Sequence, residues 1–173
     1  DEVAAGPGAP GESCGDGRLV MEGYHGRPDA TEEATWVDPD GRRWLRTGDI
    51  GRLDDDGFLY IVDRKKDMIL SGSQNIYPAD IEAVMRDHPA VADVAVVGVP
   101  SERWGETPLA LVVATGARDT PDAGSLVEWT NQRVGKQQRL AGAVYVADLQ
   151  RNPNGKILKR ELRRQYADWE KAR

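Results

Sequence analysis

The most chemically suggestive stretch of this sequence is a turn near its C-terminus that ends in Lys156. The residues before it read Asn-Pro-Asn-Gly at positions 152–155. This pattern predicts a tight turn, because proline fixes φ while asparagine and glycine tolerate a left-handed backbone. A basic, weakly amphipathic run from residue 157 to residue 166 predicts a helix. Lys156 is then a charged side chain at the end of a mobile loop, which suits contact with an anion; the alternative is a solvated lysine before a helix.

A second candidate is Asp49 in the triplet Thr47-Gly48-Asp49, which follows a short predicted strand. A carboxylate exposed by a tight turn can accept hydrogen bonds from the vicinal hydroxyls of a ribose. The alternative is an ordinary turn stabilised by the aspartate side chain. Arg64 lies in a charged junction, where it either pairs with Asp63 on the surface or faces a phosphate or ribose.

A third group of candidates lies in the loops of the C-terminal part. Gly72 allows a backbone or ligand to approach closely, and the Ser73 N–H could then meet phosphate or pantetheine groups; a plain hairpin loop is the alternative. Trp104 lies in a polar loop, where an exposed indole favours a binding surface, although packing on a neighbouring helix is also plausible. Arg139 could clamp a phosphate or be solvated.

Composition and motif spacing exclude several classes of function. Lys156 is not part of a Walker phosphate loop, because Gln150 and Ile157 stand where Gly and Ser or Thr are required. The net charge of −6 and the pI of about 5.0 argue against nucleic-acid binding, which needs a basic surface. A single cysteine, Cys14, and two histidines indicate no disulfide framework and no metal site.

The apolar runs are too short for a membrane span, and the N-terminus lacks a signal-peptide pattern. We therefore expect a soluble, cytoplasmic protein with no membrane span. The chain of 173 residues begins at Asp1 without an initiator methionine, and we expect it to be a fragment.

The order of composition, turn motifs and charged runs along the sequence predicts that the chain has two parts. Residues 1–17 are rich in Ala, Gly and Pro and predict loop or disorder. Asp-Asp-Asp-Gly at 54–57 predicts a hairpin between strands at 50–53 and 58–62. The charged run 63–67 follows and has the character of a domain boundary. We therefore divide the chain into residues 1–63 and residues 64–173.

Residues 64–173 predict a compact α+β domain. Short apolar strands are expected at 68–70, 91–99, 109–114 and 144–146. Helices are expected from Pro78, with Ile81, Val84 and Met85 on one face, and over 123–134. The predicted fold is a central short mixed sheet flanked by helices, preceded by a hairpin-rich segment.

The chain resembles the C-terminal third of an acyl-CoA synthetase of the adenylate-forming superfamily, which also contains acyl and aryl-CoA ligases, beetle luciferases and peptide-synthetase adenylation domains. The match runs from about Gly11 to Leu162 and is highly specific. It is carried by Gly-Tyr at 23–24, by Arg-Pro at 27–28, by residues 44–51, by residues 62–82 with Val-Asp-Arg-Lys-Lys-Asp at 62–67, and by Asn-Pro-Asn-Gly-Lys at 152–156.

The resemblance implies a reaction in two steps. A carboxylate attacks the α-phosphate of ATP, with Mg²⁺ in the parent enzyme, to give acyl-AMP and pyrophosphate, and the thiol of CoA then forms the thioester after the C-terminal lid swings. By resemblance, Lys156 is catalytic, Asp49 and Arg64 bind the nucleotide, and Lys66 is the hinge. Gly72 and Ser73 line the pantetheine tunnel, and Trp104 and Arg139 lie near the CoA nucleotide. No cofactor is expected to bind tightly to these residues alone.

Some positions depart from the family pattern. Ser73 replaces a common second glycine, while Gln137 and Leu140 stand where an aromatic residue and a proline are frequent, which weakens the assignment of Arg139. Leu70 occupies the position of a lysine needed by luciferases. The sequence also lacks the Ser/Thr/Gly-rich phosphate loop and the acid pocket of the large N-terminal domain, its expected partner, so we expect the isolated chain to be inactive.

Two alternatives remain open. The chain could be a non-enzymatic module modified at Lys156 by a lysine acetyltransferase, since acetylation removes the charge. It could also be a structural fragment without a ligand. The carboxylic acid cannot be read from these residues, because its pocket lies outside them.

Overall fold

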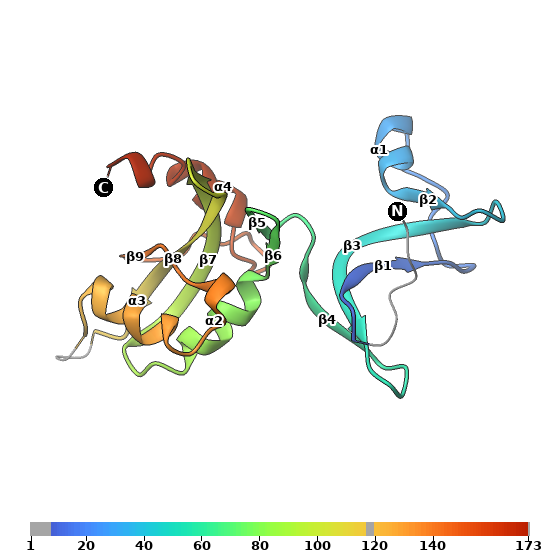
Figure 1. Ribbon diagram of the computed structural model, residues 1–173. Coiled ribbons are helices and arrows are strands. Elements are labelled where there is room, and N and C mark those ends of the chain that lie inside the picture. The colour runs from blue at the N-terminus through green and yellow to red at the C-terminus, as the bar shows by residue number, and fades with distance from the viewer. Residues whose placement is uncertain (1–7, 117–119, 173) are drawn as a thin grey trace. The chain divides into compact units, whose positions relative to one another are not determined.

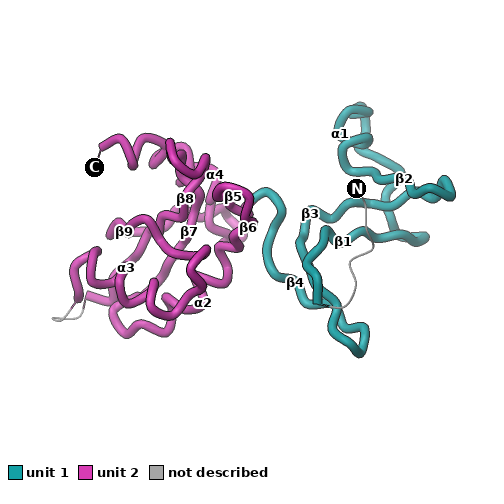
Figure 2. Tube along the Cα trace, in the orientation of Figure 1, with its two compact units in different colours: residues 1–66 teal, residues 67–173 magenta. Residues whose placement is uncertain are grey.

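The computed structural model describes residues 8–116 and 120–172 and divides into two compact units, residues 1–66 and residues 67–173 (Figures 1 and 2). Each unit is described here by itself. Among the described residues, no helix combines the length and apolar character needed to cross a membrane. The prediction for residues 1–7 lies outside the described residues.

The first unit is built around one long strand. It contains β1 (Gly11–Gly15), α1 (Pro28–Glu33), β2 (Thr35–Val37), β3 (Arg43–Leu53) and β4 (Leu59–Arg64), and β1, β2 and β4 all pair antiparallel with β3. The predicted hairpin between β3 and β4 is confirmed. Its turn is held by Asp54, whose Oδ1 accepts hydrogen bonds from the amides of Asp56 (3.0 Å) and Phe58 (2.8 Å), and Gly57 provides the positive φ of 84°.

The prediction of loop or disorder over residues 1–17 is wrong for residues 11–15, which form β1. This strand pairs with residues 45–51 of β3. Its Glu12 also forms an ion pair with Arg46 at 2.9 Å. A pairing partner 30 to 40 positions away in the chain leaves no signal in a local composition of Gly, Ala and Pro.

The second unit is a mixed sheet with helices on both faces. Its elements are β5 (Ile69–Ser71), β6 (Gln74–Ile76), α2 (Pro78–Arg86), β7 (Val91–Ser101), β8 (Gly105–Ala114), α3 (Ala123–Asn131), β9 (Gly142–Tyr145) and α4 (Lys159–Gln165), with 3-10 turns at Lys136–Gln138 and Glu170–Ala172. The strand order is β6-β5-β8-β7, and β9 pairs with β8 in the only parallel pairing that the described residues contain. The predicted α+β class with a short mixed sheet is therefore confirmed.

Local sequence explains where the two central helices begin. Pro78 occupies the first turn of α2, where its missing N–H costs no hydrogen bond. Asp122 caps α3, because its side chain accepts a hydrogen bond from the Ser125 amide at 2.9 Å. α3 ends at Asn131, three residues before the predicted end.

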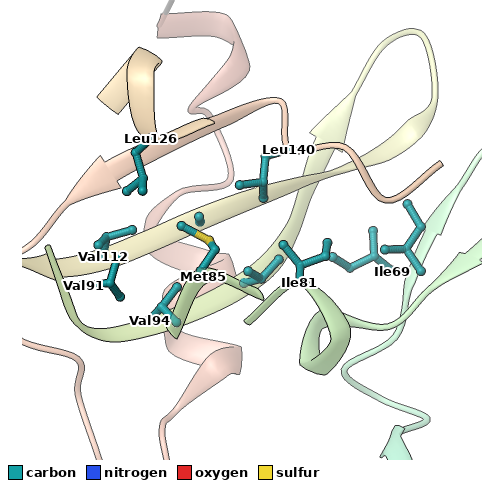
Figure 3. Close-up of a cluster of buried hydrophobic side chains, with 11 residues drawn as sticks. Ile69, Ile81, Met85, Val91, Val94, Val112, Leu126 and Leu140 are labelled. Carbon is teal, nitrogen blue, oxygen red and sulfur yellow. The ribbon is translucent and has the colours of Figure 1, made fainter. Parts of the chain in front are cut away.

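Alternation along β7 and β8 divides the core between the two faces of the sheet. Val94, Val96 and Val112 point to the face covered by α2 and α3, where they meet Met85 and Leu126 (Figure 3). The intervening residues point to the opposite face and pack against Leu162 of α4; they are Ala95, Val97, Val99, Leu109 and Leu111. Successive side chains of a strand lie on opposite faces, so both helical layers depend on one strand pair.

We expect Leu111→Ala to lower the free energy of unfolding by about 2–5 kcal/mol, because it leaves a cavity at a fully buried site. Leu70→Ala is the matched control, since the Leu70 side chain is 52% exposed. Urea unfolding followed by circular dichroism measures both variants. Equal losses for the two variants would contradict this description of the core.

Candidate functional site

Lys156 lies at the end of a short hairpin whose two arms are joined by backbone hydrogen bonds. Arg151 and Ile157 form an isolated antiparallel bridge. Within it, Asn152 Oδ1 accepts hydrogen bonds from the amides of Asn154 (3.0 Å) and Lys156 (2.9 Å), and the Asn152 amide donates to the Lys156 carbonyl at 2.9 Å. Gly155 turns the chain with a φ of 79°. The predicted tight turn before Lys156 is therefore closed by hydrogen bonds.

The side chain of Lys156 is exposed on this hairpin. An exposed ammonium on an ordered backbone can approach an anion without first ordering its loop, so less conformational entropy is lost on contact. Lys156 belongs to the second unit, whereas Asp49 and Arg64 belong to the first.

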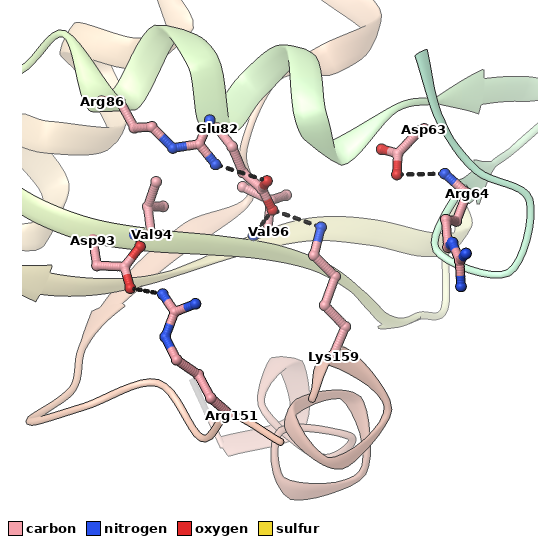
Figure 4. A network of polar contacts seen from close by, with 9 residues as sticks. All are labelled: Asp63, Arg64, Glu82, Arg86, Asp93, Val94, Val96, Arg151 and Lys159. Atoms are coloured by element: carbon pink, nitrogen blue, oxygen red, sulfur yellow. Dashed lines mark hydrogen bonds and ion pairs between the residues drawn. The ribbon is translucent and has the colours of Figure 1, made fainter. Parts of the chain in front are cut away.

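The structure brings Asp49 and Arg64 together. Arg64 Nε donates to Asp49 Oδ1 at 3.0 Å, and the two residues face each other in the β3–β4 pairing. Arg64 N also donates to Asp63 Oδ1 at 2.7 Å (Figure 4). The guanidinium thus orients the Asp49 carboxylate, while the alternative pairing of Arg64 with Asp63 involves its backbone.

A bulge in β3 presents the triplet that contains Asp49. Between the pairs Glu12–Ile50 and Cys14–Arg46, β1 contributes one residue and β3 contributes residues 47–49. The Thr47 hydroxyl donates to the Ser13 carbonyl at 2.8 Å and accepts from the Asp49 amide at 3.1 Å. Gly48 has a φ of 73°, which favours glycine. Bulges of this kind redirect side chains at functional edges.

Lys66 lies at the boundary between the two units. Before it, Lys65 N donates to the Gly48 carbonyl at 2.8 Å and Lys65 Nζ pairs with Glu12 at 2.8 Å, both within the first unit. After it, the Asp67 carbonyl accepts from Arg163 NH2 at 2.7 Å within the second unit. The neighbours of Lys66 are therefore tied to different units, which is the arrangement a hinge requires.

Gly72 and Ser73 form the turn between β5 and β6, and the structure brings this turn to Trp104. The Gly72 amide donates to the Trp104 carbonyl at 2.6 Å. Gly72 has a φ of 60°, and a Cβ there would lie 3.5 Å from Trp104 Cε3. Trp104 is 48% exposed, so the turn and the indole form an accessible surface.

Arg139 is exposed, and the described residues show no hydrogen bond, ion pair or cation–π contact between it and Trp104. The arginine that does stack on Trp104 is Arg103, whose Cζ lies 4.7 Å from the ring centroid. Sequence reasoning missed Arg103, although its position directly before Trp104 in a polar loop was a usable signal.

Glu12 is a second residue that the sequence did not single out. Its Oε2 accepts from Arg46 NH2 at 2.9 Å and from Lys65 Nζ at 2.8 Å. Burial by itself raises the pKa of the Glu12 carboxyl, but hydrogen bonds from Lys65 and Arg46 outweigh it and hold the pKa below its ordinary value of 4.5. Glu12 thereby ties the bulged strand pair to Lys65, the residue before Lys66.

Comparison with known proteins identifies a family model that matches part of this chain and relatives that are similar to most of it. Residues 80–156 match the family model described as AMP-binding enzyme C-terminal domain. The chain is 43% identical over 149 residues to a long-chain-fatty-acid–CoA ligase of Mycobacterium tuberculosis, covering 86% of this chain and 28% of that protein. It is 42% identical over 164 residues to a 2-succinylbenzoate–CoA ligase of Bacillus mycoides, covering 95% of this chain and 32% of that protein.

The chain is also similar to solved structures. ATP-bound MatB from Rhodopseudomonas palustris superposes with a TM-score of 0.85 at 32% identity, covering 95% of this chain and 32% of that one. The o-succinylbenzoate CoA synthetase MenE of Bacillus subtilis, in complex with the acyl-adenylate intermediate OSB-AMP, superposes with a TM-score of 0.78 at 37% identity, covering 91% and 31%. The chain thus spans about a third of the length of the relatives it matches.

We expect Glu12→Gln to destabilise the protein at about pH 7, by up to about 1 kcal/mol, because it removes two partly exposed ion pairs. The folded-state pKa of Glu12 lies below its unfolded value, so this contribution is present above about pH 4.5 and is lost as the pH falls further. Urea unfolding at about pH 7 and about pH 3 measures the difference. Glu22→Gln, at an exposed position, is the control, and a deficit that grows toward low pH would contradict the assignment.

Proposed function

We propose that this chain, whose residues 80–156 match the AMP-binding enzyme C-terminal domain family, is the C-terminal part of an ATP-dependent acyl- or aryl-CoA ligase. The observation that carries this proposal is the ordered Lys156 hairpin at the end of the matched region. It presents an exposed ammonium on a backbone held by hydrogen bonds to Asn152. The whole reaction belongs to the longer protein.

In the first half-reaction, an oxygen of the carboxylic acid attacks the α-phosphorus of ATP and pyrophosphate leaves. Negative charge develops on the attacking and phosphoryl oxygens. A positioned ammonium stabilises such charge more strongly in the transition state than in the ground state. We assign this role to Lys156.

Asp49 and Arg64 are proposed to bind the nucleotide. The Asp49 carboxylate is presented by the β3 bulge and is oriented by Arg64 Nε at 3.0 Å. A carboxylate held in this way accepts hydrogen bonds from the vicinal hydroxyls of a ribose. Arg64 is 49% exposed along its side chain and remains accessible to the same ligand.

In the second half-reaction, the sulfur of CoA attacks the acyl carbon and AMP leaves. We propose that rotation at Lys66 prepares the enzyme for this step, because its neighbours are tied to different units. Gly72 and Ser73 would line the path of the pantetheine arm beside Trp104. Arg103, stacked on that indole, would lie near the CoA nucleotide, and Arg139 stays a weaker candidate.

Residues 1–63 are proposed to be the end of a larger N-terminal domain, with residues 64–173 as the mobile lid. Within the first unit, Ile50 is the only buried hydrophobic side chain among the described residues, whereas Phe58 is 66% and Ile61 is 57% exposed. Such exposure on β4 and its turn suits a sheet that is covered by further protein.

The proposal names only the chemical class of the substrate, a carboxylic acid. The relatives named above act on a long-chain fatty acid and on 2-succinylbenzoate, which differ in size and polarity. Residues 8–116 and 120–172 contain no cluster of three or more His, Cys, Asp or Glu side chains that could hold a metal ion.

Acetylation of Lys156 by a lysine acetyltransferase stays a prediction. The exposure of its side chain gives an enzyme access to the amine. Acetylation would remove the charge on which the proposed first half-reaction depends.

In the longer enzyme, we expect Lys156→Ala to slow ATP–pyrophosphate exchange by about 10²- to 10³-fold, because one charge-stabilising donor is lost. Conversion of supplied acyl-AMP and CoA to the thioester should be retained. Lys171→Ala removes another exposed lysine and serves as the control. Normal adenylation by Lys156→Ala would reject the assigned role.

We expect the 173 residues alone to show no ATP–pyrophosphate exchange with any carboxylic acid, because they lack a Ser/Thr/Gly-rich phosphate loop. Exchange should appear when the same residues are assayed within the longer enzyme. Measurable exchange by the isolated chain, above that of its Lys156→Ala variant, would show that this expectation is wrong.

A further inference from the structure

Two carboxylates accept hydrogen bonds from backbone amides on the outer edge of β7. β7 pairs with β8 along its other edge. The Val94 amide donates to Asp93 Oδ1 at 2.9 Å, and the Val96 amide donates to Glu82 Oε1 at 2.8 Å. Edge strands leave such amides without a strand partner, so each carboxylate satisfies a donor that would otherwise depend on water.

The same two carboxylates bind basic side chains on either side of the Lys156 hairpin (Figure 4). Asp93 Oδ2 pairs with Arg151 NH2. Glu82 Oε1 pairs with Lys159 Nζ at 2.7 Å. Arg151 opens the hairpin and Lys159 begins α4, so both ends of the segment that carries Lys156 are attached to the edge of β7.

Arg151 also reaches into the hairpin itself. Its NH1 donates to the Gly155 carbonyl at 2.6 Å while its NH2 pairs with Asp93. The planar guanidinium can serve both acceptors at once because its donors form a fixed fork. One side chain therefore links the residue before Lys156 to the sheet.

We propose that Asp93 and Glu82 are positioning residues for Lys156, acting through Arg151 and Lys159 respectively. This inference rests on the proposed function of Lys156. A long lysine side chain stabilises a developing charge only if its backbone is held in place, and a displacement of about 1 Å can cost on the order of 100-fold in rate. Asp93 supplies that constraint from β7, and Glu82 supplies it from α2, where its carboxylate also accepts from the Val96 amide of β7.

The two ion pairs differ in burial, and this decides which one to test. The side chains of Glu82 and Lys159 are 8% and 14% exposed. Glu82 also pairs with Arg86 at 3.3 Å, so a change at Glu82 or Lys159 disturbs a largely buried charge cluster and endangers the fold. The side chains of Asp93 and Arg151 are 32% and 42% exposed. Asp93→Asn also keeps an oxygen that can accept from the Val94 amide, so it tests the ion pair with little disturbance of the strand.

The test uses the longer enzyme and compares the two half-reactions in Asp93→Asn, Arg151→Gln and the double variant. We expect the turnover of ATP–pyrophosphate exchange to fall about tenfold or more in each, with the KM for ATP changed less than about twofold. Thioester formation from supplied acyl-AMP should change less than about twofold. The double variant should be no slower than the slower single variant, because both remove one interaction.

Asp168→Asn is the matched control, because it removes an exposed carboxylate of the same unit that pairs with Lys171. Arg151→Lys should restore only part of the exchange rate, since one ammonium cannot reproduce the fork between Asp93 and Gly155. Equal losses in both half-reactions would mean that Asp93 acts only on stability and would overturn the proposal. Unchanged exchange in Asp93→Asn would also overturn it.

Lys156→Ala measured in parallel separates this proposal from the proposed function. If Lys156→Ala abolishes exchange while Asp93→Asn does not reduce it, positioning by Asp93 is wrong and the role of Lys156 stands. If Lys156→Ala leaves exchange intact, the role assigned to Lys156 fails, and the positioning of a catalytic lysine fails with it, while the proposed ligase activity stands.

Hydrogen exchange in the 173-residue chain tests the structural half of the proposal without catalysis. We expect Arg151→Gln to speed exchange of the Gly155 and Lys156 amides, which both donate to Asn152, by about three- to tenfold. The Leu111 amide, in the centre of β8, should keep its rate. Unchanged exchange at Gly155 and Lys156 would overturn the link between Arg151 and the hairpin.

Discussion

The second unit depends on the antiparallel pairing of β7 with β8, which extends from Val91–Ala114 to Ser101–Gly105. Because side chains alternate across a strand, this one pairing supplies both halves of the core. α2 and α3 cover one half and α4 covers the other. A slip of one residue would exchange the two sets of aliphatic side chains, so the register of this pair decides where every helix of the unit lies.

The free edge of the same strand connects the core to the hairpin that carries Lys156. Amides on an edge need acceptors, and Glu82 and Asp93 provide them. A carboxylate has two oxygens and room for more than one donor, so each of the two also holds a basic residue that flanks the Lys156 hairpin. The carboxylates that accept from backbone amides on this edge therefore also hold the hairpin that carries Lys156.

The first unit is organised differently. Its strands all pair with β3, but its buried aliphatic core is small. The bulge at residues 47–49 is supported by a positive φ at Gly48 and by hydrogen bonds to Thr47. The ion pairs of Glu12 connect this bulge to Lys65. The proposed nucleotide-binding residues therefore rest on hydrogen bonds and ion pairs more than on packing.

Local sequence was sufficient for features that neighbouring residues determine. It predicted the α+β class, the Asp54 hairpin, the start of α2 at Pro78 and the turn before Lys156, because proline, glycine and aspartate act on the backbone within a few residues. It did not predict β1, the stacking of Arg103 on Trp104, or the carboxylates of Asp93 and Glu82 beside Arg151 and Lys159. These features join residues that are distant in the chain or depend on which face of an element a side chain occupies, and only the folded backbone decides both.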